Sequence, residues 1–214
     1  KKSMTTGSAS MVIQDINPHN TQAVISILRD KIYTDKPKAA LTETVCNAID
    51  EHRKHGVKRP VDIVITSQNI IVRDYAKGLD EHGVMRVFFQ YMNSTKSDNN
   101  IDIGGYGIGA KAPSSYTDTW YVVSLHNGKK TTYMSTLDGE VGKTYKMLEQ
   151  DCDKDNTGIC VVIPINNERS YIRDSDSNNF RQIAYDLKNM IGCFSEEPEV
   201  ECYYYDSYST IKDH

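Results

Sequence analysis

Three side chains on one predicted helical face carry groups suited to acid–base and metal chemistry. Glu43, Asn47 and Asp50 stand at i, i+4 and i+7 in L-T-E-T-V-C-N-A-I-D-E, residues 41–51. At about 100° per residue, these positions lie within roughly 60° of one another on a helix. A carboxylate can take a proton from water, and a carboxamide oxygen suits a hard cation. Because a solvated helix surface has the same pattern, its significance depends on the segments that follow.

Two later segments add groups that favour nucleotide binding. A β-branched run ends in Asp74, and Gly78 follows it in D-Y-A-K-G. Further along, I-G-G-Y-G-I-G-A-K contains Gly104, Gly107 and Gly109 at the start of a predicted helix. Glycines in such a turn let backbone N–H groups approach an anion at a helix N-terminus. The three segments together predict a nucleotide site.

The glycine run fits neither of the two common phosphate-binding motifs. The dinucleotide motif requires a preceding strand in a parallel unit and an acidic residue further along, and that context is missing. The Walker motif ends in G-K-[ST], whereas Lys111 is followed by Ala112. The run is therefore described only as G-x-x-G-x-G.

The elements that would position these groups predict an α+β fold. A central helix is expected to be capped by Thr34 or Asp35, to hold Pro37 in its first turn and to end before Gly56. Helices gather early and strands late, joined by hairpin turns, which predicts a two-layer α/β sandwich with a mostly antiparallel mixed sheet and helices on one face. The other expected helices are 21–29, 80–91, 104–116 and 176–191, and the expected strands are 61–66, 69–73, 120–125, 131–137, 141–147, 158–163 and 200–205.

Composition favours an ordinary globular domain. The chain has 214 residues, 38% of them hydrophobic, and is expected to form one domain over residues 1–214. Its net charge of −4 does not favour direct DNA binding. Five cysteines without a C-x-x-C pair argue against a zinc site and favour a reducing, intracellular compartment. Because the sequence begins with Lys1 and not Met, we expect the amino-terminal fragment of a longer protein.

The three segments together resemble the Bergerat-fold (GHKL-type) ATPases, which include gyrase B subunits, ninety-kilodalton heat-shock chaperones, histidine kinases and MutL. The resemblance rests on E-x-x-x-N-A-x-D at residues 43–50, D-x-x-x-G at 74–78 and G-x-x-G-x-G at 104–109. The second motif departs from the family, which usually has glycine where this chain has Ala76. An alanine fits there if its φ is negative.

This resemblance implies a role for each motif residue. Glu43 would be the general base toward water, and Asn47 would be a ligand of Mg²⁺. Asp50 would support the nucleotide through water, Asp74 would accept from the adenine amino group, and Gly78 would let the chain pass close to the base. The phosphate oxygens would be bound by the backbone N–H groups of Gly104, Gly107 and Gly109, by Lys96 from a lid over residues 93–100, and, on a weaker resemblance, by Lys111. Thr157 would lie behind the adenine ring.

A narrower resemblance is to the amino-terminal domain of the rIIA-like family of phage proteins. It rests on Y-T-D-K at residues 33–36, S-T-K at 94–96, Y-T-D-T at 116–119 and T-G-I-C-V-V-I-P at 157–164. This family implies an rIIB-like companion protein, action against host exclusion of phage, and location in the host cytoplasm or peripherally at the inner membrane.

We therefore expect binding and slow hydrolysis of Mg-ATP, with nucleotide ordering a lid that controls homodimerisation or partner docking. A catalytic lysine from a following domain is a feature of several such families. The alternatives are a module that binds ATP without hydrolysis, and the ATPase domain of a type II topoisomerase or MutL-like DNA-processing protein. A phosphotransfer kinase is disfavoured because no phosphoacceptor helix is evident, and His52 and His55 are expected to be surface residues.

Overall fold

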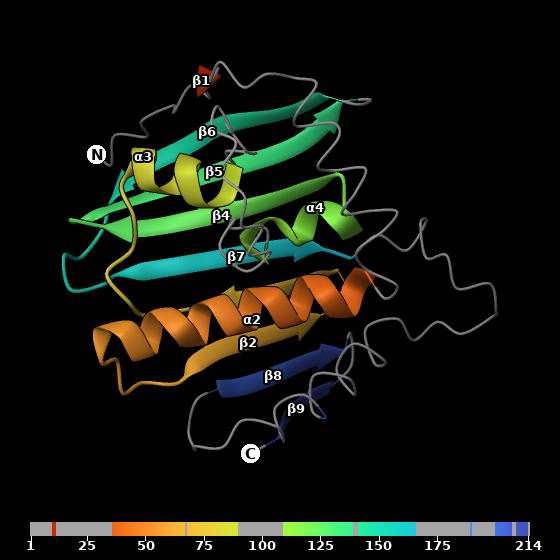
Figure 1. The fold of residues 1–214 in the computed structure, drawn as a ribbon. Helices are drawn as coiled ribbons and strands as arrows, with labels where there is room; N and C mark the ends of the chain where they lie inside the picture. Colours follow the sequence, from red (N-terminus) through yellow and green to blue (C-terminus); the bar gives the residue numbers. More distant parts are fainter. Residues whose placement is uncertain are drawn as a thin grey trace, which may run out of the picture.

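One mixed sheet organises the part of the chain that the structure describes. The computed structural model describes residues 10–11, 36–66, 68–89, 109–138, 141–165, 189, 200–206 and 209–213. Within these residues nine strands lie in the order β1-β6-β5-β4-β7-β3-β2-β8-β9 (Figure 1). Their bounds are β1 Ser10–Met11, β2 Val61–Thr66, β3 Asn69–Arg73, β4 Thr119–His126, β5 Lys129–Asp138, β6 Val141–Asp151, β7 Gly158–Pro164, β8 Val200–Asp206 and β9 Ser209–Asp213.

The sheet is mostly antiparallel, as the sequence predicts. Adjacent strands pair antiparallel except β2 and β8, which pair in parallel with Val61 opposite Val200. The β4–β5 hairpin turns at Asn127 and Gly128, both with positive φ, which matches the twist of the flanking strands. The parallel β8 and the strand β9 complete one edge of the sheet.

Helices cover one face of this sheet. They are α2 (Lys36–His55), α3 (Glu81–Val84), the π-helical turn η2 (Met85–Phe89), the 3₁₀ turn η4 (Gly109–Lys111) and α4 (Pro113–Tyr116). Figure 1 shows α2, α3 and α4 on the same side of the strands, with α2 against β2 and β3. The α+β two-layer arrangement is therefore confirmed. Among the described residues, no helix has the length and apolar character needed to span a membrane.

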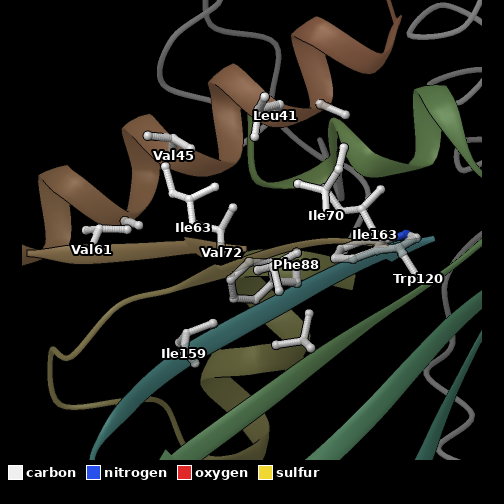
Figure 2. Close-up of a cluster of buried hydrophobic side chains, with 14 of the residues drawn as sticks. Leu41, Val45, Val61, Ile63, Ile70, Val72, Phe88, Trp120, Ile159 and Ile163 are labelled. Atoms are coloured by element: carbon white, nitrogen blue, oxygen red, sulfur yellow. The ribbon is translucent and has the colours of Figure 1, made fainter. Parts of the chain in front are cut away.

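The core lies between α2 and the strands beneath it. Alternate residues of β2 and β3 are buried, so Ile63 and Val72 face Leu41 and Val45 of α2 (Figure 2). Burying one such side chain contributes about 1.5–3 kcal/mol relative to leaving it exposed. Trp120 of β4 extends this layer toward α4. This packing fixes the position of the helix that carries the acid-amide face.

Local end signals appear where the sequence predicts them. Gly56, with φ of 65°, ends α2, and Asp80 caps α3 by accepting a hydrogen bond from Gly83 N–H at 2.7 Å. The expected helix 21–29 and the proposed cap at Thr34 or Asp35 lie outside the described residues, as does the expected helix 176–191 apart from Asn189.

Candidate nucleotide-binding site

The end of the glycine run lies directly against the acid-amide face of α2. A Cβ added to Gly109 would lie 2.5 Å from Oε2 of Glu43 and 3.7 Å from Nδ2 of Asn47. Glu43 and Asn47 are one turn apart, so both reach the first residue of η4 from the same side of the helix. The structure thus brings together two segments that are far apart in the sequence.

The Asn47 carboxamide, beside Gly109, has a buried nitrogen without a hydrogen-bond partner. Its Nδ2 is buried and is the only buried side-chain nitrogen or oxygen without a hydrogen-bond partner in the described part of the chain. Leaving such a group unpaired costs about 1–3 kcal/mol. Rotation of the carboxamide by half a turn exchanges Nδ2 with Oδ1, so this position can offer either a donor or a cation ligand. The residue therefore suits a bound polar group.

The donor set fits Mg²⁺ of the kind that binds with a phosphorylated ligand. Within the described residues, no group of three or more His, Cys, Asp and Glu side chains could hold a metal ion. Mg²⁺ in nucleotide sites takes one or two protein oxygens and completes its shell with phosphate oxygens and water. Asn47 beside Glu43 meets that requirement.

Asp74 forms a second, buried acidic position at the end of β3. Its residue is only 6% exposed, and Oδ1 accepts a hydrogen bond from Ala76 N–H at 2.9 Å. Burial raises the carboxyl pKa to about 6, against the opposing effect of hydrogen bonds from the backbone of Ala76 and Ile159 and of the Arg73 charge. The Glu51 charge raises the pKa further. Tyr75, the next residue, donates its N–H to Nε2 of His52 at 2.7 Å, which places this segment beside the later turns of α2.

Gly78 occupies a position that no other residue could take without rearrangement. Its φ is 66°, and a Cβ there would overlap the backbone carbonyl of Leu125 in β4. Two contacts hold the same loop on β4: Leu79 N–H donates to Ser124 Oγ at 3.0 Å, and that hydroxyl donates to Leu79 O at 2.6 Å. The D-x-x-x-G segment is therefore fixed against the sheet.

Gly158 backs Asp74, a contact that the sequence interpretation did not identify. A Cβ on Gly158 would overlap the Asp74 backbone carbonyl and lie 3.0 Å from Oδ1. Thr157, which the sequence suggested for this place, precedes it, and its carbonyl accepts from Arg73 Nη2 at 2.8 Å. The order T-G in this chain, in place of the G-T that is frequent in the Bergerat-fold ATPases, is the sequence feature that could have indicated Gly158. Ala76 has no positive φ, so alanine fits at that position.

Asp50, the third residue of the predicted face, extends into solvent. Its side chain is 74% exposed, and Oδ1 lies 3.9 Å from Arg53 Nη1, one turn along the helix. The structure thus places the third carboxylate of the predicted face in solvent, with a cation beside it.

Lys111 points into the helical layer. It is buried, and its Nζ donates to the Val87 carbonyl of η2 at 2.9 Å. Burial lowers the pKa of this ammonium to about 8. The other predicted phosphate-binding residues, Lys96, Gly104 and Gly107, lie outside the described residues.

His52 differs from its expected surface position. It is 5% exposed, and its Nε2 accepts from Tyr75 N–H at 2.7 Å. The spacing of Leu41, Val45, Ala48 and His52, at i, i+4, i+7 and i+11, continues the apolar stripe of α2 and was the signal for burial. His55, in contrast, lies at the surface with Nε2 3.2 Å from Glu51 Oε2.

Neither a scan against models of protein families nor a search of curated proteins finds a match to this chain. Its function is therefore inferred from the geometry above and from the motifs.

Proposed function

We propose that this chain binds Mg-ATP and hydrolyses it slowly. The observation that carries the proposal is the contact of Gly109 with Glu43 and Asn47, which joins the first and third motifs around one helix face. The buried Asp74 would supply the second end of the site, because its neighbour Tyr75 is hydrogen-bonded to His52 in the later turns of the same helix.

The spacing along α2 supports a ligand with two different ends. Glu43 and Glu51 are separated by eight residues, which is about 12 Å along a helix axis at 1.5 Å per residue. Gly109 lies at the Glu43 turn, and Tyr75, which follows Asp74, is hydrogen-bonded to His52, which follows Glu51. A nucleoside triphosphate likewise has its base and its terminal phosphate at opposite ends. The backbone near Gly109 would receive phosphate, and Asp74 would receive the base.

At the phosphate end, Glu43 would orient water and take its proton as the water oxygen forms a bond to the γ-phosphorus. The bond from that phosphorus to the β–γ bridging oxygen breaks, and ADP and inorganic phosphate result. Asn47 would hold Mg²⁺ through Oδ1, and the ion when bound neutralises phosphate charge. Gly109 leaves room for the Glu43 carboxylate because it has no side chain.

At the base end, Asp74 would select adenine. An ionised carboxylate only accepts hydrogen bonds, so it suits the exocyclic amino group of adenine and not the keto oxygen of guanine. Because burial raises the pKa of this carboxyl to about 6, it is ionised at pH 7.5. Gly158 and Gly78 let the backbone pack closely around it.

The biological setting is proposed from the sequence resemblance alone. Within the ATPase class, an rIIA-like role would couple nucleotide binding to homodimerisation or to an rIIB-like companion at the host membrane. The expected lid, residues 93–100, lies outside the described residues. The proposal therefore depends on the two ends of the site.

Equilibrium binding and phosphate release test the proposal together. We expect ATP and a non-hydrolysable ATP analogue to bind with Mg²⁺ and GTP to bind at least about tenfold more weakly, which corresponds to about 1.4 kcal/mol. Glu43→Ala should retain nucleotide binding and lose phosphate release. Asp151→Ala, which removes an exposed carboxylate paired with Lys129 in the β5–β6 pair, is the matched control.

Four outcomes would redirect the proposal. Equal affinity for GTP and ATP would contradict the role of Asp74. Unchanged phosphate release in Glu43→Ala would contradict the role of Glu43 as base. Binding of ATP with no phosphate release in the unmodified chain would favour a binding module, and stimulation by duplex DNA in the intact protein would favour a topoisomerase or MutL-like role.

A further inference from the structure

A buried histidine joins the helix that carries Glu43 to the residue that follows Asp74. Nε2 of His52 accepts from Tyr75 N–H at 2.7 Å. The backbone of Arg59, in the turn that leads into β2, interacts with the imidazole and favours its protonated form, so it opposes the lowering of the His52 pKa by burial. Because Nε2 accepts from Tyr75 N–H, the neutral imidazole carries its proton on Nδ1.

The side chain of Tyr75 is held as well, so the hydrogen bond that its N–H donates to His52 joins two restrained residues. Its hydroxyl donates to Asp62 Oδ2 and receives a hydrogen bond from Arg59 Nη2 at 2.7 Å. The Arg59 guanidinium lies over the tyrosine ring, 3.5 Å from its centroid. The backbone N–H of Tyr75 is the atom that links this residue to α2.

We propose that His52 is a positioning residue that holds the Asp74 carboxylate in place for the adenine amino group by anchoring the Tyr75 backbone to α2. This inference rests on the proposed function. Asp74 and Tyr75 share a peptide bond, so a shift of the Tyr75 amide moves the carboxylate that packs against Gly158. The same helix carries Glu43 and Asn47, so His52 also fixes the distance between the two ends of the site.

The anchor requires an uncharged imidazole. Protonation of Nε2 would place one N–H against another, since the Tyr75 amide can only donate. The charged and titratable groups that face His52 from the neighbouring elements are Asp62 of β2, Arg59 of the preceding turn and Tyr75. Burial lowers the pKa of His52 and outweighs the Arg59 backbone and the Asp62 charge, which favour the protonated ring, so the anchor is intact at neutral pH.

Two substitutions separate the two ring nitrogens. Glutamine carries its carboxamide at the position of Nε2, so His52→Gln can still accept from Tyr75 N–H. Asparagine carries its carboxamide at the position of Nδ1, so His52→Asn keeps a polar group there but cannot reach Tyr75. Both variants remove the same imidazole, which makes each the control for the other.

Affinity for a non-hydrolysable ATP analogue at pH 8 is the first measurement. His52→Asn should bind about tenfold more weakly, as expected for loss of one positioning hydrogen bond, and His52→Gln should stay within about twofold of the unmodified chain. Amide hydrogen exchange at Tyr75 without nucleotide is the second measurement. It should accelerate at least tenfold in His52→Asn relative to His52→Gln.

A pH series adds a readout that a purely structural residue would not change. As the pH is lowered, the affinity of the unmodified chain should fall as Asp74, whose pKa burial raises to about 6, takes up a proton. It should fall more steeply once the buried His52, whose pKa is lowered, is protonated as well, and His52→Gln should lack this second loss. The ligand's own titration is common to both proteins and cancels in their difference.

Each result has a defined meaning. Equal affinities of the Asn and Gln variants would overturn the proposal, even if Tyr75 exchange differs, because the bond would then be structural only. Equal exchange at Tyr75 would overturn the anchor itself. Absence of ATP binding by the unmodified chain would instead refute the proposed function, and the positioning role with it, while the exchange experiment would still report on the anchor.

Discussion

Gly109 lies so close to Glu43 that a methyl group on the glycine would come within 2.5 Å of the carboxylate oxygen Oε2. The atom in the way is the end of a flexible side chain, so it can move aside. Gly109→Ala should therefore cost less than about 1 kcal/mol in stability but displace the carboxylate, and a displacement of about 1 Å can slow catalysis by about a hundredfold. Steady-state phosphate release and denaturant unfolding measure the two effects.

The double variant Glu43→Ala/Gly109→Ala is the control for that prediction. Once the carboxylate is removed, the added methyl group has nothing to displace, so the second substitution should not slow phosphate release further. A further slowing would show that Gly109→Ala acts through another route.

Gly78→Ala should destabilise the fold by roughly 3 kcal/mol or more, because a positive φ and an overlap with the Leu125 carbonyl combine. Gly56→Ala is a matched control, since its φ of 65° equals that of Gly78 within one degree and nothing lies within 4 Å of its added Cβ. It should cost about 1–2 kcal/mol from the backbone alone. Equal losses in chemical denaturation would contradict the close approach at Gly78.

Local patterns predicted most elements of this fold. Alternating β-branched residues predict the β2–β3 pair, Gly56 predicts the end of α2, and Asp80 predicts the cap of α3. Each of these signals acts within a few residues, and the structure has all three features. The parallel pairing of β8 with β2 depends on segments far apart in the chain, which no local periodicity encodes.

In the candidate site, too, local sequence predicts some features and contacts between distant segments decide others. Motif spacing indicated Glu43, Asn47 and Gly109, and the structure brings these three together. Motif spacing could not show that Gly158, one residue beyond Thr157, would pack against Asp74, since strand register decides that contact. The polar character of His52 predicts a surface position, whereas the structure buries it because it continues the apolar stripe of α2.

Asp74→Asn should increase stability at pH 7 while weakening ATP binding. Burial raises the carboxyl pKa from 3.8 to about 6, so the folded chain binds more protons than the unfolded chain between these values. The contribution of Asp74 to stability is therefore complete below pH 3.8 and is lost as pH rises through about 6, a loss on the order of 3 kcal/mol.

The asparagine variant lacks this titration, so the unfolding free energies of the two proteins should diverge from about pH 4 to 6 and then run parallel. Calorimetric binding at pH 7.5 should show at least about tenfold weaker ATP affinity, because the amide Nδ2 meets the adenine amino group as a second donor. A variant that gains stability and keeps full affinity would refute the role of Asp74 in binding the base.

Lys111→Met should remove a pH dependence of stability on the alkaline side. Burial lowers the pKa of the Lys111 ammonium from 10.5 to about 8, so between these values the unfolded chain binds more protons than the folded chain. The unfolding free energy of the unmodified protein should therefore rise with pH from about 8 to 10.5, by on the order of 3 kcal/mol, relative to the variant. Urea unfolding across this range measures it. Parallel curves for the two proteins would mean that the ammonium bound to the Val87 carbonyl keeps an ordinary affinity for its proton, and that it is better hydrated than its burial implies.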